Sequence, residues 1–278
     1  MQKYPSLTPS RIFLSIVLVI GIGVFILITA GLIASSAYSD LESPGAERIL
    51  ILAQSLALFL APPIILMNAL KLPRAEFLAI NAVQFKLSHL LYFTLIVIGS
   101  LFTIDLLAHL NENLIQDAQW AQSWIKKGET TIALQEELLS NMTLSTLVAN
   151  GIIFVVAPAI GEELFFRGML QGLFTKKLNH HIAIFLTALI FSALHWQIFN
   201  LLPILFMGAL FGYIKHWTQS IWIPIALHFI NNALALAAAY VAKAESVDQS
   251  ALAESSWSYV GVFLCCAGLY GVYINRRT

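Results

Sequence analysis

Charge is scarce in this 278-residue chain. Only 11% of its residues are charged, against about 25% in soluble domains, and 59% are hydrophobic. The 15 basic and 15 acidic residues cancel, so the chain lacks the positive field that nucleic-acid binding needs. The two cysteines, Cys265 and Cys266, are neighbours in an apolar segment, which excludes a disulfide framework and a thiolate metal site.

The hydrophobic residues gather in eight segments, each near the roughly 20 residues that a membrane-spanning helix needs. The sequence therefore predicts an all-α, polytopic membrane protein with a single integral membrane domain over residues 1–278. The predicted spans are 12–35, 49–69, 87–108, 144–170, 181–198, 201–217, 220–241 and 257–274. The first is expected to be a retained helix because its apolar run exceeds the about 7–15 residues of a signal peptide, although Ala34-Ser35-Ser36-Ala37 resembles a cleavage site.

The basic residues between these segments predict the orientation. With both termini cytoplasmic, ten basic residues fall on the inner side and four on the outer side, as the positive-inside rule expects. The inner set is Lys3, Arg11, Lys71, Arg74, Lys86, Lys176, Lys177, Lys215, Arg276 and Arg277, and the outer set is Arg48, Lys126, Lys127 and Lys243.

One extended polar region, residues 109–142, is predicted to lie outside the membrane as an amphipathic loop. Apolar residues recur there at three- and four-residue steps, at Leu114, Ala118, Ala121 and Ile125. This spacing is typical of an amphipathic helix, and the flanking Trp120 and Trp124 suit the membrane interface. We predict an interfacial anchor, with a lid or a substrate-docking element as the alternative.

Ionisable residues interrupt the fourth span. Each costs at least roughly 2.5–3.5 kcal/mol at bilayer depth, so such residues persist mainly when they are paired or functional. In a helix, Glu163 and Arg167 share a face and can form an ion pair, whereas Glu162 points about 100° away from Glu163. Glu162 is therefore predicted to be a general base and Glu163–Arg167 a structural brace. The alternative is a buried charge network that only fixes helix packing. Pro158 and Gly161 predict a bend that opens space beside Glu162.

Two later spans carry polar pairs at the same spacing. Phe191 and His195 share a face of the fifth span, and His228 shares a face of the seventh with Asn232, for which Asn231 is an i+3 alternative. Singly, each pair is also typical of hydrogen bonding between membrane helices. Together, a carboxylate, two imidazoles and an amide on three spans provide the base, orienting group and oxyanion donors of a hydrolytic site.

The motifs Glu-Glu-x-x-x-Arg, Phe-x-x-x-His and His-x-x-x-Asn occur in this order on the fourth, fifth and seventh predicted spans. They resemble the motifs of the CAAX protease and bacteriocin-processing (CPBP, or Abi) family, which includes the eukaryotic Ras-converting prenyl-protein endopeptidase. The likeness covers residues 144–241, which would form the protease core. It implies an intramembrane endopeptidase in which Glu162 and His195 activate a water, while His228 and Asn232 bind the oxyanion.

A zinc site made of Glu162, His195 and His228 is the alternative to a metal-free mechanism. The metal-free mechanism is favoured because there is no His-Glu-x-x-His helix and no second carboxylate free to act as base. The expected partners are the lipid bilayer and a peptide or protein substrate, lipid-modified or membrane-embedded, at the inner (plasma) membrane of a bacterium. Two other functions stay open: a non-proteolytic immunity or scaffold protein of the same fold, and a transporter with a buried proton relay.

Overall fold

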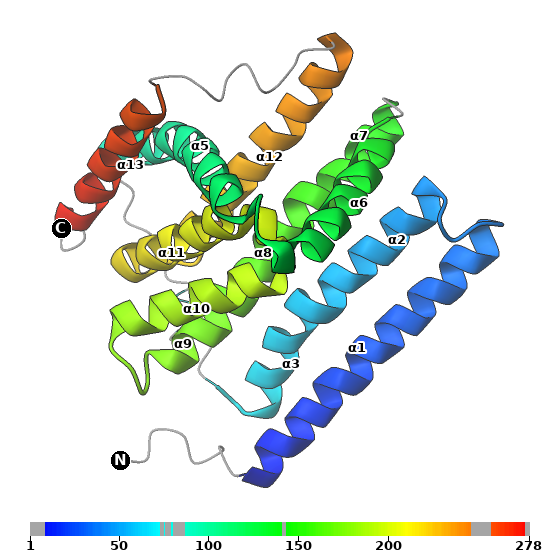
Figure 1. Cartoon of the computed structure of the whole chain (residues 1–278). Coiled ribbons are helices and arrows are strands. Elements are labelled where there is room, and N and C mark those ends of the chain that lie inside the picture. The colour runs from blue at the N-terminus through cyan, green and yellow to red at the C-terminus, as the bar shows by residue number, and fades with distance from the viewer. Residues whose placement is uncertain are drawn as a thin grey trace.

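The computed structural model describes residues 9–72, 75, 79, 87–140, 143–245 and 257–275, and the regular elements in these ranges are all helices (Figure 1). The all-α prediction is thereby confirmed for the described part of the chain. Several basic residues that entered the predicted orientation lie outside it: Lys3, Arg74, Lys86, Arg276 and Arg277. Cytoplasmic termini therefore stay a prediction.

Within the described ranges, six helical stretches are long and apolar enough to cross a membrane. They are α1 (Pro9–Ala37), the run of α2 (Pro44–Ser55), η1 (Leu56–Leu60) and α3 (Ala61–Ala69), α5 (Leu87–Ile115), the run Leu144–Phe174, the run of η5 (Ile198–Asn200) and α11 (Leu201–Thr218), and α12 (Trp222–Glu245). Large apolar side chains face outward on these helices; on α1, Phe13, Phe25 and Leu32 are each at least 65% exposed. Such surfaces suit lipid rather than water, as expected of a multi-pass membrane protein.

The predicted count of eight spans is not confirmed. The fifth and eighth predicted spans form shorter helices, α10 (His180–Leu194) and α13 (Trp257–Ile274). With 15 residues, α10 is about 22 Å long, less than the roughly 30 Å of a bilayer core. It begins where the Asn179 side chain accepts a hydrogen bond from the Ile182 amide, and it ends before Trp196, whose left-handed φ of 55° stops a helix. The apolar residues after Trp196 led the prediction to extend this span too far.

The helices pack in neighbouring pairs. Figure 1 shows α1 beside α2 and α3, α10 beside α11, and α5 beside α13. The run Leu144–Phe174 consists of α7 (Leu144–Gly151), η3 (Ile152–Val156), α8 (Ala157–Glu162), η4 (Glu163–Leu170) and α9 (Gln171–Phe174), and it lies between α2–α3 and α12. Its polar motif therefore faces other helices on more than one side.

Wide π-helical turns interrupt this motif-bearing run. The π-helical η3 ends just before Pro158, and a second π-helical stretch, η4, begins at Glu163. Proline removes a backbone donor and displaces the preceding turn, which accounts for the irregular winding before α8. The bend predicted at Pro158 thus corresponds to a local change of winding, and π-helical segments are frequent at functional sites.

The amphipathic pattern expected to form one helix is divided between two. α5 continues to Ile115, and after a turn the chain forms η2 (Gln119–Ala121) and α6 (Gln122–Leu138). The step from Leu114 to Ala118 crosses this turn, so spacing alone was misleading there. α6 packs against η5, next to the end of α10. Residues 141 and 142 of the predicted loop lie outside the described residues, and its position relative to the membrane stays a prediction.

Candidate active site

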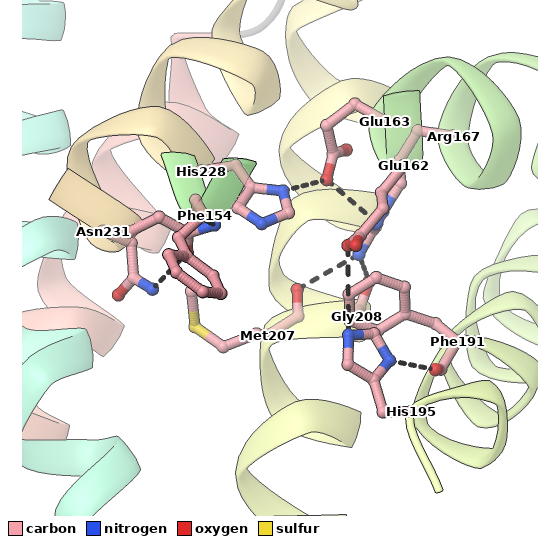
Figure 2. Close-up of polar contacts among 11 residues, drawn as sticks. Phe154, Glu162, Glu163, Arg167, Phe191, His195, Met207, Gly208, His228 and Asn231 are labelled. Atoms are coloured by element: carbon pink, nitrogen blue, oxygen red, sulfur yellow. Dashed lines mark hydrogen bonds and ion pairs between the residues drawn. The ribbon is translucent and has the colours of Figure 1, made fainter. Parts of the chain in front are cut away.

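Three helical segments bring most of the motif side chains together (Figure 2), namely Glu162, Glu163, Arg167, Phe191, His195 and His228. Glu162 is the last residue of α8 and Glu163 the first of η4, so the two carboxylates flank the change in winding. His195 directly follows α10, and His228 lies within α12. Glu162, Glu163 and His228 are all buried. The structure therefore joins residues that the sequence separates by up to 66 positions into one enclosed polar site.

Glu162 faces His195. Glu162 Oε2 and His195 Nε2 are 4.0 Å apart, and these side chains keep 11% and 25% exposure. That separation is too long for a direct hydrogen bond, and a water placed about 2.8 Å from each atom would bridge them. The predicted base and the first histidine are therefore spaced to share one water.

The proton position on His195 follows from its second contact. His195 Nδ1 lies 2.7 Å from the Phe191 carbonyl oxygen, and a carbonyl only accepts, so Nδ1 carries the proton. In the neutral ring, Nε2 is then an acceptor, and it faces a carboxylate that is also an acceptor. A water can donate one hydrogen to each of them. Phe191 thus contributes its backbone carbonyl as well as the packing role predicted for its side chain.

Glu163 is at the centre of a second, fully enclosed group. Its Oε1 accepts from Arg167 Nη1 at 2.9 Å and lies 2.9 Å from His228 Nδ1. Glu163 and Arg167 have no exposed side-chain surface. The predicted ion pair is present, and its carboxylate also contacts His228, which the sequence interpretation had assigned to the oxyanion site or, as the alternative, to zinc. A carboxylate only accepts, so His228 Nδ1 carries a proton, and its Nε2 can donate only when the ring is protonated twice.

Arg167 also joins the motif helix to α11, a contact that the sequence interpretation missed. Its Nη2 donates to the Gly208 carbonyl at 3.0 Å, and one turn later Gln171 Nε2 donates to the Gly212 carbonyl at 3.1 Å. A Cβ added at Gly208 would press into Ala188 of α10, so the absence of a side chain there lets α10 and α11 approach closely. The four-residue step shared by Arg167–Gln171 and Gly208–Gly212 was the available sequence signal.

Aromatic rings surround the guanidinium of Arg167. Its Cζ lies 4.5 Å from the ring centroid of Phe191 and 5.5 Å from that of Phe211. The Phe211 ring in turn stacks on His228 at a centroid distance of 5.2 Å. Arg167, Phe211 and His228 therefore form a packed unit in which charge, ring faces and the Glu163 carboxylate restrain one another.

Asn232 lies one turn beyond His228 and makes a different contact. Its Nδ2 donates to the Phe154 carbonyl of η3 at 3.1 Å, and its Oδ1 accepts from Asn231 Nδ2 at 3.3 Å. Asn232 and Phe154 line a hollow of about 270 Å³ between η3 and α12. One of the two N–H bonds of Asn232 is thus used to hold these helices together, which leaves the other for a ligand.

The residues present do not form a ready zinc site. In the described part of the chain, no three His, Cys, Asp or Glu side chains are grouped closely enough to hold a metal ion. Of the three alternative ligands, Glu162 and His195 face each other, whereas His228 directs Nδ1 to Glu163. A zinc-bound imidazole commonly donates its other N–H to a carboxylate or a carbonyl, so the contact with Glu163 leaves the Nε2 lone pair of His228 available, and the metal-free mechanism stays a prediction.

The fold and this site together define a class: a polytopic helical membrane protein with an acid–imidazole centre among its helices. Residues 144–234 match the family model described as type II CAAX prenyl endopeptidase Rce1-like. The resemblance to the CPBP and CAAX protease family that the three motifs indicated is therefore confirmed for this part of the chain, which carries every predicted site residue.

Two curated proteins of Bacillus subtilis (strain 168) are similar to part of the chain. The putative membrane peptidase YdiL is 29% identical over 92 residues, 32% of this chain and 38% of YdiL. The uncharacterized protein YpbD is 32% identical over 89 residues, 30% of this chain and 42% of YpbD. The alignments thus span about two fifths of these relatives. No solved structure matched the chain.

Proposed function

We propose that the protein is an intramembrane endopeptidase that hydrolyses a peptide bond without a metal. The observation that carries this proposal is the 4.0 Å separation of Glu162 and His195 in an enclosed site. Because both groups accept hydrogen bonds, they orient one water and leave its lone pairs for attack. The match to a prenyl endopeptidase family and the name of YdiL support peptide-bond hydrolysis. The family description also favours a lipid-modified substrate at the membrane.

In the proposed mechanism, Glu162 takes a proton as the water oxygen bonds to the scissile carbonyl carbon. The carbonyl π electrons move onto oxygen and give a tetrahedral oxyanion. When the intermediate collapses, the C=O bond re-forms, the C–N bond breaks, and the proton held by Glu162 passes to the leaving nitrogen. His195 orients the water through Nε2 while its Nδ1–H stays on the Phe191 carbonyl. The products are a carboxylic acid and an amine, and transfer of the acid proton leaves a carboxylate and an ammonium group.

His228 and Asn232 are the proposed oxyanion donors. His228 Nδ1 is directed at Glu163, so Nε2 donates to an oxyanion only in the imidazolium form. Asn232 contributes the N–H that is not used by Phe154. In this scheme Glu163 is a positioning residue for His228 as well as the partner of Arg167, which extends the purely structural role first predicted for it.

The test is a comparison of the peptides released by cells that express the wild type or the Glu162→Gln variant from the same promoter. We expect a set of peptides that appear only with the wild type. Their new termini would define the cleavage site and provide a substrate for kinetic measurements. If both strains release the same peptides and Glu162→Gln keeps the biological effect of the protein, the immunity or scaffold function is favoured instead. Proton-coupled uptake that requires Glu162, without new peptides, would favour a transporter.

The proposed location is the plasma membrane of a bacterium. Both similar proteins come from a bacterium, and the outward apolar surfaces require a bilayer. Membrane fractionation of the expressed protein, with periplasmic and cytoplasmic labelling of single cysteines introduced in the loops, tests the location and the predicted orientation together.

A further inference from the structure

His195 lies where a helix is least restrained. α10 is 15 residues long and ends at Leu194, so both His195 and the Phe191 carbonyl that orients it belong to its last turn. Terminal turns of helices open more readily than helix interiors. The 4.0 Å geometry between His195 and Glu162 therefore depends on what holds the chain directly after this turn.

A buried amide on α5 holds that segment. Asn111 is 2% exposed, and its Nδ2 donates to the Ile198 carbonyl at 2.8 Å. Its Oδ1 accepts from the Leu202 amide at 3.0 Å. One side chain thus pairs with backbone groups at the start of η5 and in the first turn of α11, using the donor and the acceptor that a primary amide combines. Within α10, Ser192 Oγ adds a bond to the Leu201 carbonyl at 2.9 Å.

A second contact comes from α6. The rings of Trp124 and Trp196 stack at a centroid distance of 5.6 Å and an interplanar angle of 12°. Trp196 follows His195 directly and has the left-handed backbone, unusual for a bulky residue, that ends α10. Four residues beyond Trp124, a Cβ on Gly128 would run into the ring of Phe199, so α6 lies directly on the same segment.

We propose that Asn111 is a positioning residue: by fixing residues 198–202 it holds the end of α10, and hence His195, against Glu162, with the Trp124–Trp196 stack as a second clamp. Asn111 and Trp124 both precede residues 144–234, so the segment that matches the family model does not contain them. The position of His195 relative to Glu162 can be measured whether or not the protein is a peptidase. Its effect on rate rests on the proposed function.

The direct test is NMR of protein in detergent micelles with ¹³C-labelled histidine rings, in which His195→Gln assigns the His195 signal. We expect Asn111→Ala to shift or broaden the His195 signal and to leave the His228 signal in place. We also expect faster deuterium exchange at the Leu202 amide, which loses its acceptor. Asn113→Ala is the matched control because Asn113 is exposed on the same helix, and it should change neither readout.

An unchanged His195 signal in folded Asn111→Ala overturns the proposal. Should Asn111→Ala not fold, Trp124→Ala serves with Trp120→Ala as its control, since Trp120 is 65% exposed. A His195 signal that is unchanged in Trp124→Ala, or not restored by Trp124→Phe, overturns the proposal in that case.

The kinetic consequence is measured separately on a peptide identified by release from the wild type. Misplacement of a catalytic group by a remote substitution costs up to about 10²-fold in rate, and we expect Asn111→Ala to lower kcat by this order with KM nearly unchanged. If Glu162→Gln cleaves as well as the wild type, the proposed function fails, while the histidine signal still decides whether Asn111 positions His195.

Discussion

Glu162 and Glu163 are neighbours in sequence with opposite surroundings. Glu163 has no exposed side-chain surface and accepts from both Arg167 and His228 through one oxygen. Glu162 keeps 11% exposure, and the nearest ion-pair partner among the described residues is His195 at 4.0 Å. One position along a helix therefore separates a carboxylate with two direct partners from a carboxylate whose facing histidine is too far away for a direct hydrogen bond.

The difference in surroundings assigns Glu163 to the stability of the fold and Glu162 to the proposed reaction. A buried charge whose partners are fixed contributes by holding helices in register, and removing a partner leaves an uncompensated charge. A carboxylate that must gain and lose a proton during a reaction needs an exchangeable partner, such as water. We therefore expect substitution of Glu162 to lower the cleavage rate and disruption of the Glu163–Arg167 pair to lower the stability of the fold.

The largest expected effect is on rate. Glu162→Gln should lower kcat by about 10²–10⁴ because an amide of equal size cannot accept the proton of water. The thermal unfolding temperature in detergent should stay close to that of the wild type, because Glu162 is not part of the Glu163–Arg167 group. Near-normal cleavage by this variant would remove Glu162 from the mechanism.

Arg167→Ala should instead lower stability. It leaves Glu163 without its guanidinium partner and two carbonyls of α11 without their donor, and breaking a buried pair costs roughly 3–5 kcal/mol. Unfolding by heat or denaturant measures the loss, with the exposed Lys126→Ala as control. A variant that is as stable as the wild type and only fails to cleave would place Arg167 in substrate binding.

His228→Ala and Asn232→Ala should each lower kcat by about 10²–10³, the usual effect of removing one oxyanion donor. Asn231→Ala is the matched control because Asn231 contacts Asn232 without reaching Phe154, and its effect should be smaller. Steady-state rates on one peptide distinguish the three variants. Equal losses at Asn231 and Asn232 would argue that the pair holds α12 in place rather than binding an oxyanion.

Metal removal should have the smallest effect. Elemental analysis of the purified protein should find well under one zinc per chain, and a strong chelator should not abolish cleavage. One tightly bound zinc per chain, lost on His228→Ala and needed for activity, would contradict the metal-free mechanism and favour Glu162, His195 and His228 as ligands.

The sequence predicted local pairs well because helical spacing is a local property. The Glu163–Arg167 ion pair follows from an i,i+4 step. Glu162 and His195 lie on different helices, so their pairing was expected from the family resemblance and not from spacing. Spacing could not show that His228 contacts Glu163, because that contact spans 65 positions and depends on how α12 packs. It also could not place the end of α10, which a left-handed Trp196 determines within an apolar run.

The contacts that hold the motif residues in place from outside the motifs were the hardest to predict from the sequence. Asn111 was assigned to a polar loop, and nothing in its own neighbourhood indicates that it binds backbone groups of residues 198 and 202. The carbonyls of α11 that receive Arg167 carry no residue-specific signal, and only the spacing of Gly208 and Gly212 hinted at a close helix approach.

The central claim is that Glu162 and His195 act as one unit on a single water, and a double-mutant cycle tests it most directly. Cleavage rates are measured on one peptide for the wild type, Glu162→Gln, His195→Ala and the double variant. If both residues hold the same water, the double variant should be about as slow as the slower single variant, because the second loss removes nothing more. Two losses that multiply in the double variant would show that the residues act independently and would contradict the shared-water mechanism.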